Sequence, residues 1–352
     1  MKSQFKKEFA KLLDNTKAPS TLSQEEHIKA LRELHDFVQP HIPSKLFRFR
    51  KCGIDEMISF EQGTIPMCIA DKFSDKYDSN VYCNYKLLSD RFEYFFRLTI
   101  SNIVQKIRLN SISFPDCPFK TQITDMIENN DSDCEIVNVI RKNFDSVIEK
   151  IKTEMKEQEV WPRNNKLTKI GCFTERIDSK IMWDHYADGY KGFALEYDFR
   201  KWYVLDANLY PIIYSNQMLD ATEMIDRICA FKYINSIQPE EANKKIFELL
   251  KGQLLWEYPV DLMYFTKIYL YKDRKEYSYE REWRMLKISI DDNQDYISIP
   301  DKGYLRAIYY GLNMEPRYKA HLRTIAKTKG IKEYEVVLNK NSKKYSLSVV
   351  PL

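Results

Sequence analysis

Two carboxylates and a guanidinium alternate within residues 279–284, whose sequence is YEREWR. If this segment is helical, Glu280 and Arg284 form an i,i+4 ion pair worth roughly a few tenths of a kcal/mol. If it is extended, Glu280, Glu282 and Arg284 share one face with the apolar residues that follow. Burying such charges is costly unless they are paired or face a cleft. The alternation that continues to residue 290 favours a strand that delivers these groups to a cleft, although a structural ion pair has the same pattern.

A second segment, residues 170–197, combines aromatic and polar side chains and predicts a strand, a short helix, a glycine turn and another strand. Met182, His185 and Tyr186 lie on one face of that helix, and Trp183 lies about a quarter turn away. Such rings can hold a planar ligand by stacking while their polar tips form hydrogen bonds. An aromatic packing helix with one hydrogen-bonded histidine has the same pattern.

Two arginines alternate with aromatic residues in residues 45–50 (KLFRFR), which predicts a short strand with Arg48 and Arg50 on one face. A guanidinium binds phosphate or carboxylate oxygens through two parallel hydrogen bonds. The alternative is a strand face exposed to solvent. Residues 72–78 (KFSDKYD) predict a polar turn with aromatic anchors.

Composition excludes several classes of site. The 352 residues include nine glycines, and neither G-x-G-x-x-G nor G-x-x-x-x-G-K-[ST] occurs, which argues against Rossmann enzymes, P-loop NTPases and kinases. Seven cysteines and five histidines show no metal-ligand spacing, so no metal site is expected. The scattered cysteines indicate reduced thiols and a cytoplasmic location. No apolar run reaches the ~18 residues of a membrane span, so no membrane partner is expected.

The expected elements indicate an α+β protein with a mixed, largely antiparallel β core and an added helical lobe. Residues 1–40 predict helix, with a capping box at Ser23 and Glu26. Strands are expected at 45–50, 168–175, 192–199, 210–215, 282–290, 305–310, 332–338 and 345–350, and further helices at 84–160, 218–235, 239–256 and 316–328. We therefore expect N-terminal helices at 1–43, a core of 44–83 and 166–352, and a helical insertion or lobe at 84–165. The alternative is that these helices belong to one mixed core.

The four segments, in this order, resemble the bacterial domain-of-unknown-function family numbered 2971. Its members open with a strand like LYRYR, continue with a loop like FNDPFD and a block like CFSE…MW…YA…GF…EY, and close with YExEWR. The corresponding residues here are 46–50, 73–78, 172–197 and 279–284. The loop departs from the pattern because Ser74 and Lys76 replace the usual Asn and Pro.

The order of these groups is also similar to that of ADP-ribosyltransferases, which are mixed α+β proteins that bind NAD without a glycine-rich loop. These enzymes carry an Arg or His on a first strand, a Ser-Thr-Ser-like middle strand and a Gln/Glu-x-Glu near the end. The corresponding residues here are Arg48 or Arg50, Thr174, and Glu280 with Glu282.

This similarity implies an ADP-ribosyltransferase or NAD glycohydrolase of the kind found among toxins and phage-defence effectors, with NAD as its substrate and a protein or nucleic acid as acceptor. It implies that Glu282 stabilises an oxocarbenium-like centre and that Glu280 orients or deprotonates the acceptor. An arginine of the first strand would hold the pyrophosphate, and a ring of the short helix would contact the nicotinamide. The residues expected to bind NAD are Arg48, Arg50, Thr174, Trp183, His185, Tyr186 and Arg284.

Two other functions also fit the sequence. A nucleic-acid or protein binding module of a stress or defence system would use the 24 tyrosines as stacking surfaces. A Mg²⁺-dependent hydrolase would need a carboxylate cluster, but no such spacing occurs near Glu280, and Arg284 would compete with the cation for Glu282.

Overall fold

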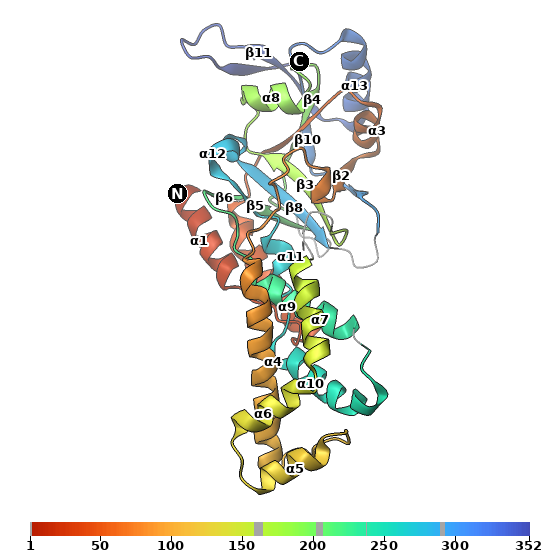
Figure 1. Cartoon of the computed structure of the whole chain (residues 1–352). Coiled ribbons are helices and arrows are strands. Elements are labelled where there is room, and N and C mark those ends of the chain that lie inside the picture. Colours follow the sequence, from red (N-terminus) through yellow and green to blue (C-terminus); the bar gives the residue numbers. More distant parts are fainter. Residues whose placement is uncertain (1, 158–164, 202–206, 237, 289–292) are drawn as a thin grey trace.

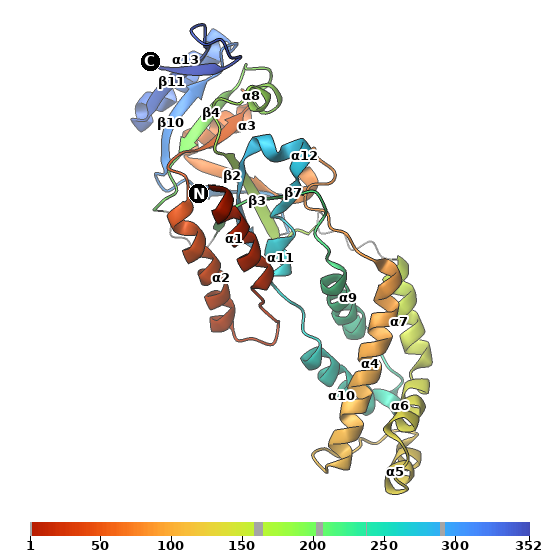
Figure 2. The same cartoon turned by 90° about the vertical axis from the view of Figure 1, so that its left-hand side faces the viewer.

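The molecule is elongated, with a β-sheet at one end and a group of helices at the other (Figures 1 and 2). This computed structural model describes residues 2–157, 165–201, 207–236, 238–288 and 293–352. Helices and strands are mixed along the chain and most of the sheet is antiparallel, so the predicted α+β class is confirmed.

Two N-terminal helices, α1 (Lys2–Asn15) and α2 (Gln24–Val38), lie against the sheet. The capping box predicted at the start of α2 is confirmed: the Ser23 hydroxyl accepts from the backbone N–H of Glu26, and the Glu26 carboxylate accepts from the backbone N–H of Ser23. Phe5 of α1 stacks on Trp283 with 6.4 Å between ring centroids, and Phe9 stacks on Tyr210 at 5.8 Å. These helices therefore cover the sheet behind the YEREWR segment.

Ten strands of the described chain form one sheet, in the order β12-β11-β10-β4-β1-β3-β2-β9, with β8 pairing with β3 and β5. All of its pairs are antiparallel except β10 with β11. The strands are β1 (Leu46–Arg50), β2 (Thr64–Cys68), β3 (Thr168–Thr174), β4 (Phe193–Tyr197), β5 (Asn208–Pro211), β8 (Glu282–Ile288), β9 (Tyr296–Pro300), β10 (Leu305–Tyr310), β11 (Lys332–Leu338) and β12 (Leu347–Pro351). A separate parallel pair joins β6 (Ile213–Ser215) to β7 (Tyr271–Asp273).

Helices distant in sequence pack around the long helix α4 (Tyr85–Arg108), away from the sheet (Figure 2). One face of α4 carries an apolar stripe that is buried, as at Phe92, Phe96 and Ile100. Its partners are α6 (Asp133–Lys142), α7 (Asp145–Glu157), α9 (Thr222–Ser236) and α10 (Lys244–Glu257), and α5 (Lys120–Glu128) packs on α6. This helical group thus contains the helices expected at 84–160 and, in addition, α9 and α10 from the later part of the chain. The division of the chain into N-terminal helices, a core and a helical insertion stays a prediction.

The remaining helices lie close to the sheet. They are α3 (Ile54–Gln62), α8 (Lys180–Tyr186), α11 (Tyr264–Lys267), α12 (Arg274–Tyr277) and α13 (Pro316–Lys329). Pro316 begins α13 and Gly330, at φ +63°, ends it, which agrees with the helix expected at 316–328. The strands expected at 332–338 and 345–350 form the antiparallel β11–β12 pair. Among the described helices, none has the length and apolar character needed to cross a membrane.

Candidate functional site

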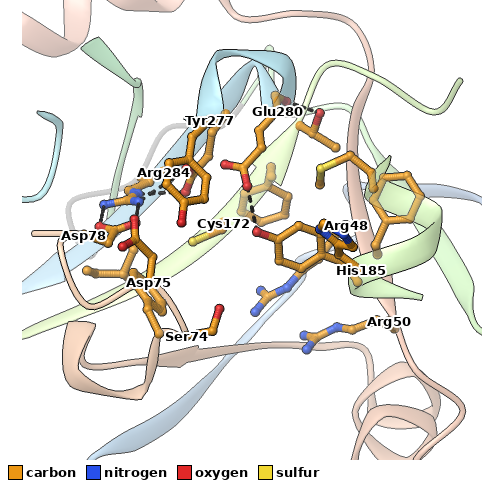
Figure 3. Close-up of a pocket in the computed structure, with 18 of the residues that line it drawn as sticks. Arg48, Arg50, Ser74, Asp75, Asp78, Cys172, His185, Tyr277, Glu280 and Arg284 are labelled. Carbon is orange, nitrogen blue, oxygen red and sulfur yellow. Dashed lines mark hydrogen bonds and ion pairs between the residues drawn. The ribbon is translucent and has the colours of Figure 1, made fainter. Parts of the chain in front are cut away.

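A pocket of about 470 Å³ lies where side chains of β1, β3, β8, α8 and the loop at 72–78 converge (Figure 3). Strand β1 pairs with β3 at a single position, Phe47 with Thr174, whereas it pairs with β4 along its whole length. Side chains from both β1 and β3 line the pocket beyond that position. All four segments singled out in the sequence contribute to it.

The basic side of the pocket is formed by Arg48 and Arg50, which lie on one face of β1 as predicted and are half-buried. Arg48 donates from Nη2 to the Pro66 carbonyl at 2.5 Å, while its Nη1 is buried without a hydrogen-bond partner. The guanidinium lies over the backbone of β3, since a Cβ at Gly171 would meet Arg48 Nη1 at 3.5 Å, an ordinary contact distance. In the described part of the chain, no carboxylate lies within ion-pair distance of either arginine.

Both arginines are therefore held in the pocket at an electrostatic cost. Burial lowers the pKa of Arg48. Burial and the adjacent charge of Arg48 lower the pKa of Arg50 to about 9. Two uncompensated cations side by side, partly removed from water, form a site that an anion would stabilise.

The acidic side of the pocket carries both predicted glutamates, but the backbone that presents them differs from the prediction. Strand β8 begins at Glu282, and Glu280 lies in a 3₁₀ turn (Ser278–Glu280) instead of on the strand. Arg281, between them, has φ +48°, a left-handed conformation that interrupts the extended backbone. The strand expected at 282–290 thus begins at the predicted residue, whereas the expectation that Glu280 shares its extended backbone is wrong. Both carboxylates nevertheless line the pocket.

A buried lysine joins the two glutamates. Lys272, at the centre of β7, donates from Nζ to Glu280 Oε2 at 2.7 Å and to Glu282 Oε2 at 3.0 Å. Its ammonium also lies 3.4 Å from Asp78 Oδ2 and 4.5 Å from the centroid of the Tyr277 ring. One cation therefore bridges three carboxylates.

Arg284 completes this cluster and is fully buried. Its Nε donates to Glu282 Oε1 at 2.7 Å, and Nη1 and Nη2 donate to Asp78 at 2.8 and 2.5 Å. The carboxylates of Glu282 and Asp78 thus both accept charge-assisted hydrogen bonds from this guanidinium. With three carboxylates and two cations, the cluster of Asp78, Lys272, Glu280, Glu282 and Arg284 carries one net negative charge when all its members are ionised.

The two glutamates have pKa values displaced in opposite directions. Burial opposes ionisation of Glu282, but the charges of Arg284 and Lys272 outweigh it and hold the pKa of Glu282 below its ordinary value. Burial and the neighbouring charge of Glu282 raise the pKa of Glu280 despite its contact with Lys272. Glu282 is thereby kept as a carboxylate, and Glu280 is the member of the pair that binds a proton more readily.

Two further predicted residues, Thr174 and Tyr186, contact Glu280. The Tyr186 hydroxyl donates to Glu280 Oε1 at 2.7 Å, and burial raises the pKa of that phenol, with the charge of Glu280 adding to the effect. The Thr174 hydroxyl donates to the backbone carbonyl of Glu280 and accepts from the backbone N–H of Arg176 at 3.0 Å. Thr174 therefore fixes the 3₁₀ turn that presents Glu280, and its hydroxyl is already engaged.

The short helix α8 presents its predicted residues on different sides. His185 and Tyr186 line the pocket. Trp183 does not: it is fully buried, donates from Nε1 to the Ile177 carbonyl at 2.7 Å, and packs edge-to-face on Phe49 at 4.9 Å. The expectation that Trp183 contacts a ligand ring thus has no support in its position, because its indole is directed into the core that holds α8 against β1.

Lys272 was not among the residues predicted from the sequence, and Asp78 was expected merely to belong to a turn. Lys272 lies in a three-residue strand whose parallel partner β6 is 58 residues earlier, Ile213 pairing with Tyr271. The Asp78–Arg284 contact spans 206 residues. A signal was present for Asp78, since it ends the loop that matches the family pattern, but none was present for Lys272.

No group of three or more His, Cys, Asp or Glu side chains suited to a metal ion occurs among the residues that the structure describes. In the pocket, each carboxylate of the cluster already faces Lys272 or Arg284. A divalent cation would have to displace one of these two side chains.

Comparison with known proteins identifies part of this site. Residues 182–285 match the family model described as "Protein of unknown function (DUF2971)". The match confirms the family resemblance expected from the motifs over the stretch that contains Tyr186, Lys272, Glu280 and Glu282, while the β1 arginines lie outside it. No curated protein and no solved structure matches the chain at a significant level.

Proposed function

We propose that this chain is an NAD-consuming enzyme similar to ADP-ribosyltransferases, with the pocket beside β1, β3 and β8 as its active site. The observation that carries this proposal is the distribution of charge. Two arginines without a carboxylate partner among the described residues share one pocket with two glutamates of oppositely displaced pKa. NAD has the complementary distribution, since its pyrophosphate is anionic and its nicotinamide ring is cationic.

The arginine side suits the pyrophosphate. Arg48 and Arg50 present two guanidinium groups from adjacent positions of one strand face, which matches the two phosphate groups of a dinucleotide. Binding an anion would supply the missing partner of Arg48 Nη1 and relieve the repulsion between the two cations. The volume of about 470 Å³ lies within the range typical of small-molecule sites.

The carboxylate side suits the nicotinamide ribose. A carboxylate has about four lone-pair positions, and Glu282 uses three of them for Lys272 and Arg284, whereas Glu280 uses two for Lys272 and Tyr186. Glu280 is therefore the better placed of the two to accept a hydrogen bond from ribose. Glu282, for which the stabilising role was expected, contributes the permanent negative charge of the cluster and positions Lys272.

The reaction follows from these placements. The bond between the ribose C1′ and the nicotinamide nitrogen breaks, and its electron pair neutralises the pyridinium ring. The net negative charge of the cluster stabilises the oxocarbenium-like centre left on the ribose. The acceptor, which is water or another hydroxyl or amine, forms the new bond to C1′ and passes its proton to Glu280. Tyr186 or His185 stacks on the nicotinamide ring.

Arg50→Met tests this proposal most directly. Because the charge of Arg50 is unfavourable in the folded state, we expect the free energy of unfolding to increase by about 1 kcal/mol while NAD binding is lost. Thermal unfolding with and without NAD measures both quantities, and chromatography of released nicotinamide measures turnover. The matched control is Arg32→Met, at an exposed arginine of α2.

A wild-type protein that neither gains thermal stability with NAD nor releases nicotinamide would contradict the proposal and leave the binding module as the better interpretation. An Arg50→Met variant that is destabilised and still turns NAD over would also contradict it, since Arg50 would then be a structural residue.

A further inference from the structure

Positive charge is concentrated at one end of the sheet. Residues 301–352 contain 11 Lys and Arg against 4 Asp and Glu, a formal charge of +7 in a chain whose net charge is +4. These residues form β10, α13, β11 and β12, at the edge of the sheet farthest from the helical group (Figures 1 and 2). The rest of the chain is net negative, so the positive electrostatic potential of the molecule is expected at this end.

The turn between β11 and β12 holds a cluster of lysines without carboxylate partners in the part of the chain that the structure describes. Lys340, Lys343 and Lys344 are exposed, and Tyr345 is 94% exposed. Lys180, the first residue of α8, is also exposed and places its Nζ 5.4 Å from the centroid of the Tyr345 ring. Within the described ranges, no carboxylate forms an ion pair with any of these four lysines. We call these five residues the hairpin surface.

The nearby helix α13 differs in this respect. Its basic residues Arg317, Lys319 and Arg323 form ion pairs with glutamates of the same region. Three of the five Lys and Arg side chains of α13 are therefore compensated. The hairpin surface differs from the helix because an exposed aromatic ring accompanies its lysines.

The combination of an exposed ring with unpaired ammonium groups indicates one kind of partner. Single-stranded nucleic acids bind through phosphate contacts to lysine and through stacking of bases on aromatic side chains. An acidic peptide would engage the lysines but leave the tyrosine ring unused. A lipid surface could use the lysines and exposed apolar residues of the same strands, such as Leu338, but it offers no planar group to stack on the ring. The geometry thus favours a nucleic-acid strand over either alternative.

We propose that the hairpin surface binds single-stranded nucleic acid beside the mouth of the pocket. Lys180 and His185 are five residues apart on α8, a rise of about 7.5 Å, so a strand held at Tyr345 lies close to the pocket-lining end of this helix. Asp184 and Asp188 are exposed there and repel phosphates, which confines the phosphate contacts to the hairpin. If the proposed function holds, on which this last step rests, the bound strand is the acceptor of the ADP-ribosyl group.

The test is the binding of a fluorescein-labelled single-stranded 20-mer, measured by anisotropy between 50 and 200 mM salt without NAD. We expect Lys343→Ser/Lys344→Ser to weaken binding about tenfold at low salt and to reduce the slope of log K against log salt by about 1.4, or 0.7 for each lost phosphate contact. Tyr345→Ala is expected to weaken binding at least about fivefold with little change in that slope. The matched control is Lys142→Ser/Lys150→Ser, at exposed lysines of α6 and α7.

If the wild type does not bind the oligonucleotide, or if the control variant loses as much affinity, the proposal that the hairpin surface binds nucleic acid is wrong. Equal affinity for polyglutamate or anionic phosphatidylserine vesicles, with the same dependence on Lys343 and Lys344, would also overturn it. The two proposals fail separately: oligonucleotide binding without NAD reports on the surface alone, and nicotinamide release without oligonucleotide reports on the enzyme alone. With both present, transfer of ³²P-labelled ADP-ribose to the oligonucleotide supports its role as acceptor, and label confined to free ADP-ribose contradicts that role.

Discussion

Glu280 and Glu282 differ in what their charge does to the folded state, although they are two residues apart and share Lys272. A pKa below the ordinary value means that folding favours the carboxylate, and a pKa above it means that folding favours the neutral acid. The charge of Glu282 therefore stabilises the fold and the charge of Glu280 opposes it. A site that retains an unfavourable charge at Glu280 has the property expected of a functional residue, whereas a structural ion pair alone would not need it.

This difference predicts opposite effects of two matched substitutions. We expect Glu282→Gln to lower the free energy of unfolding by about 2 kcal/mol or more, because Arg284 and Lys272 lose a charged partner while remaining buried. Glu280→Gln should leave it unchanged or raise it, and both variants should lose nicotinamide release. Chemical denaturation of the wild type and both variants at pH 7.5 measures the two changes in the free energy of unfolding. Equal destabilisation by the two substitutions would show that the glutamates are equivalent structural partners.

At the scale of elements, the pocket depends on close backbone approach at the end of β1. A Cβ at Gly192, just before β4, would lie 2.0 Å from the Arg50 carbonyl oxygen, so no other residue fits there without displacing the strand. Gly192 also accepts from the backbone N–H of Gly311 at 3.0 Å, which joins the turn after α8 to the end of β10. The position of Arg50 is thus fixed by backbone packing and not by a partner for its side chain.

Gly192→Ala is therefore expected to destabilise the protein by about 2 kcal/mol or more and to weaken NAD binding, since β1 must move. The control is Gly252→Ala in α10, where an added Cβ meets nothing within 4 Å. That substitution should stabilise the protein by up to about 1 kcal/mol through helix propensity. Thermal unfolding of both variants, with and without NAD, distinguishes the effects; a Gly192→Ala variant as stable as wild type would contradict the close approach.

Elements with a local signal could be predicted from the sequence, and elements defined by distant partners could not. Strands β10 and β11 have the predicted bounds, and the capping box of α2 is where Ser23 and Glu26 place it. Strand β2 was missed because Pro66 interrupts its pattern and its partner β9 is more than 200 residues away. The same reason applies to the site: the arginine pair follows from strand alternation, whereas the turn at Glu280 depends on the left-handed backbone of Arg281, which has no sequence signature.

At the scale of the whole molecule, the sheet and the helical group differ in how their buried charges are compensated. The pocket cluster holds three carboxylates against two cations. In the helical group, Asp226 of α9 is fully buried, its Oδ2 accepts from Arg91 Nε at 3.1 Å and from the Tyr258 hydroxyl, and its Oδ1 has no hydrogen-bond partner. Burial raises the pKa of Asp226 to about 6, although Arg91 opposes the shift. This carboxyl is therefore the point at which the packing of α4, α9 and α10 responds to pH.

The sign of that response follows from linkage. With a folded pKa of about 6 and an unfolded value near 3.8, Asp226 binds its proton more tightly in the folded state, so its contribution favours folding at low pH and is lost as pH rises from about 4 through about 6. The full effect is about 3 kcal/mol, at about 1.4 kcal/mol for each pKa unit. Asp226→Asn should remove it, so the variant's free energy of unfolding relative to wild type should increase by that amount between pH 4 and pH 7. Urea denaturation of both proteins at several pH values gives the difference between their free energies of unfolding. The contributions of the other titrating groups are the same in both proteins and cancel in this difference. Asp90→Asn, at an exposed position of α4, is the control, and a difference independent of pH would show that the Asp226 carboxyl has the same proton affinity in both states.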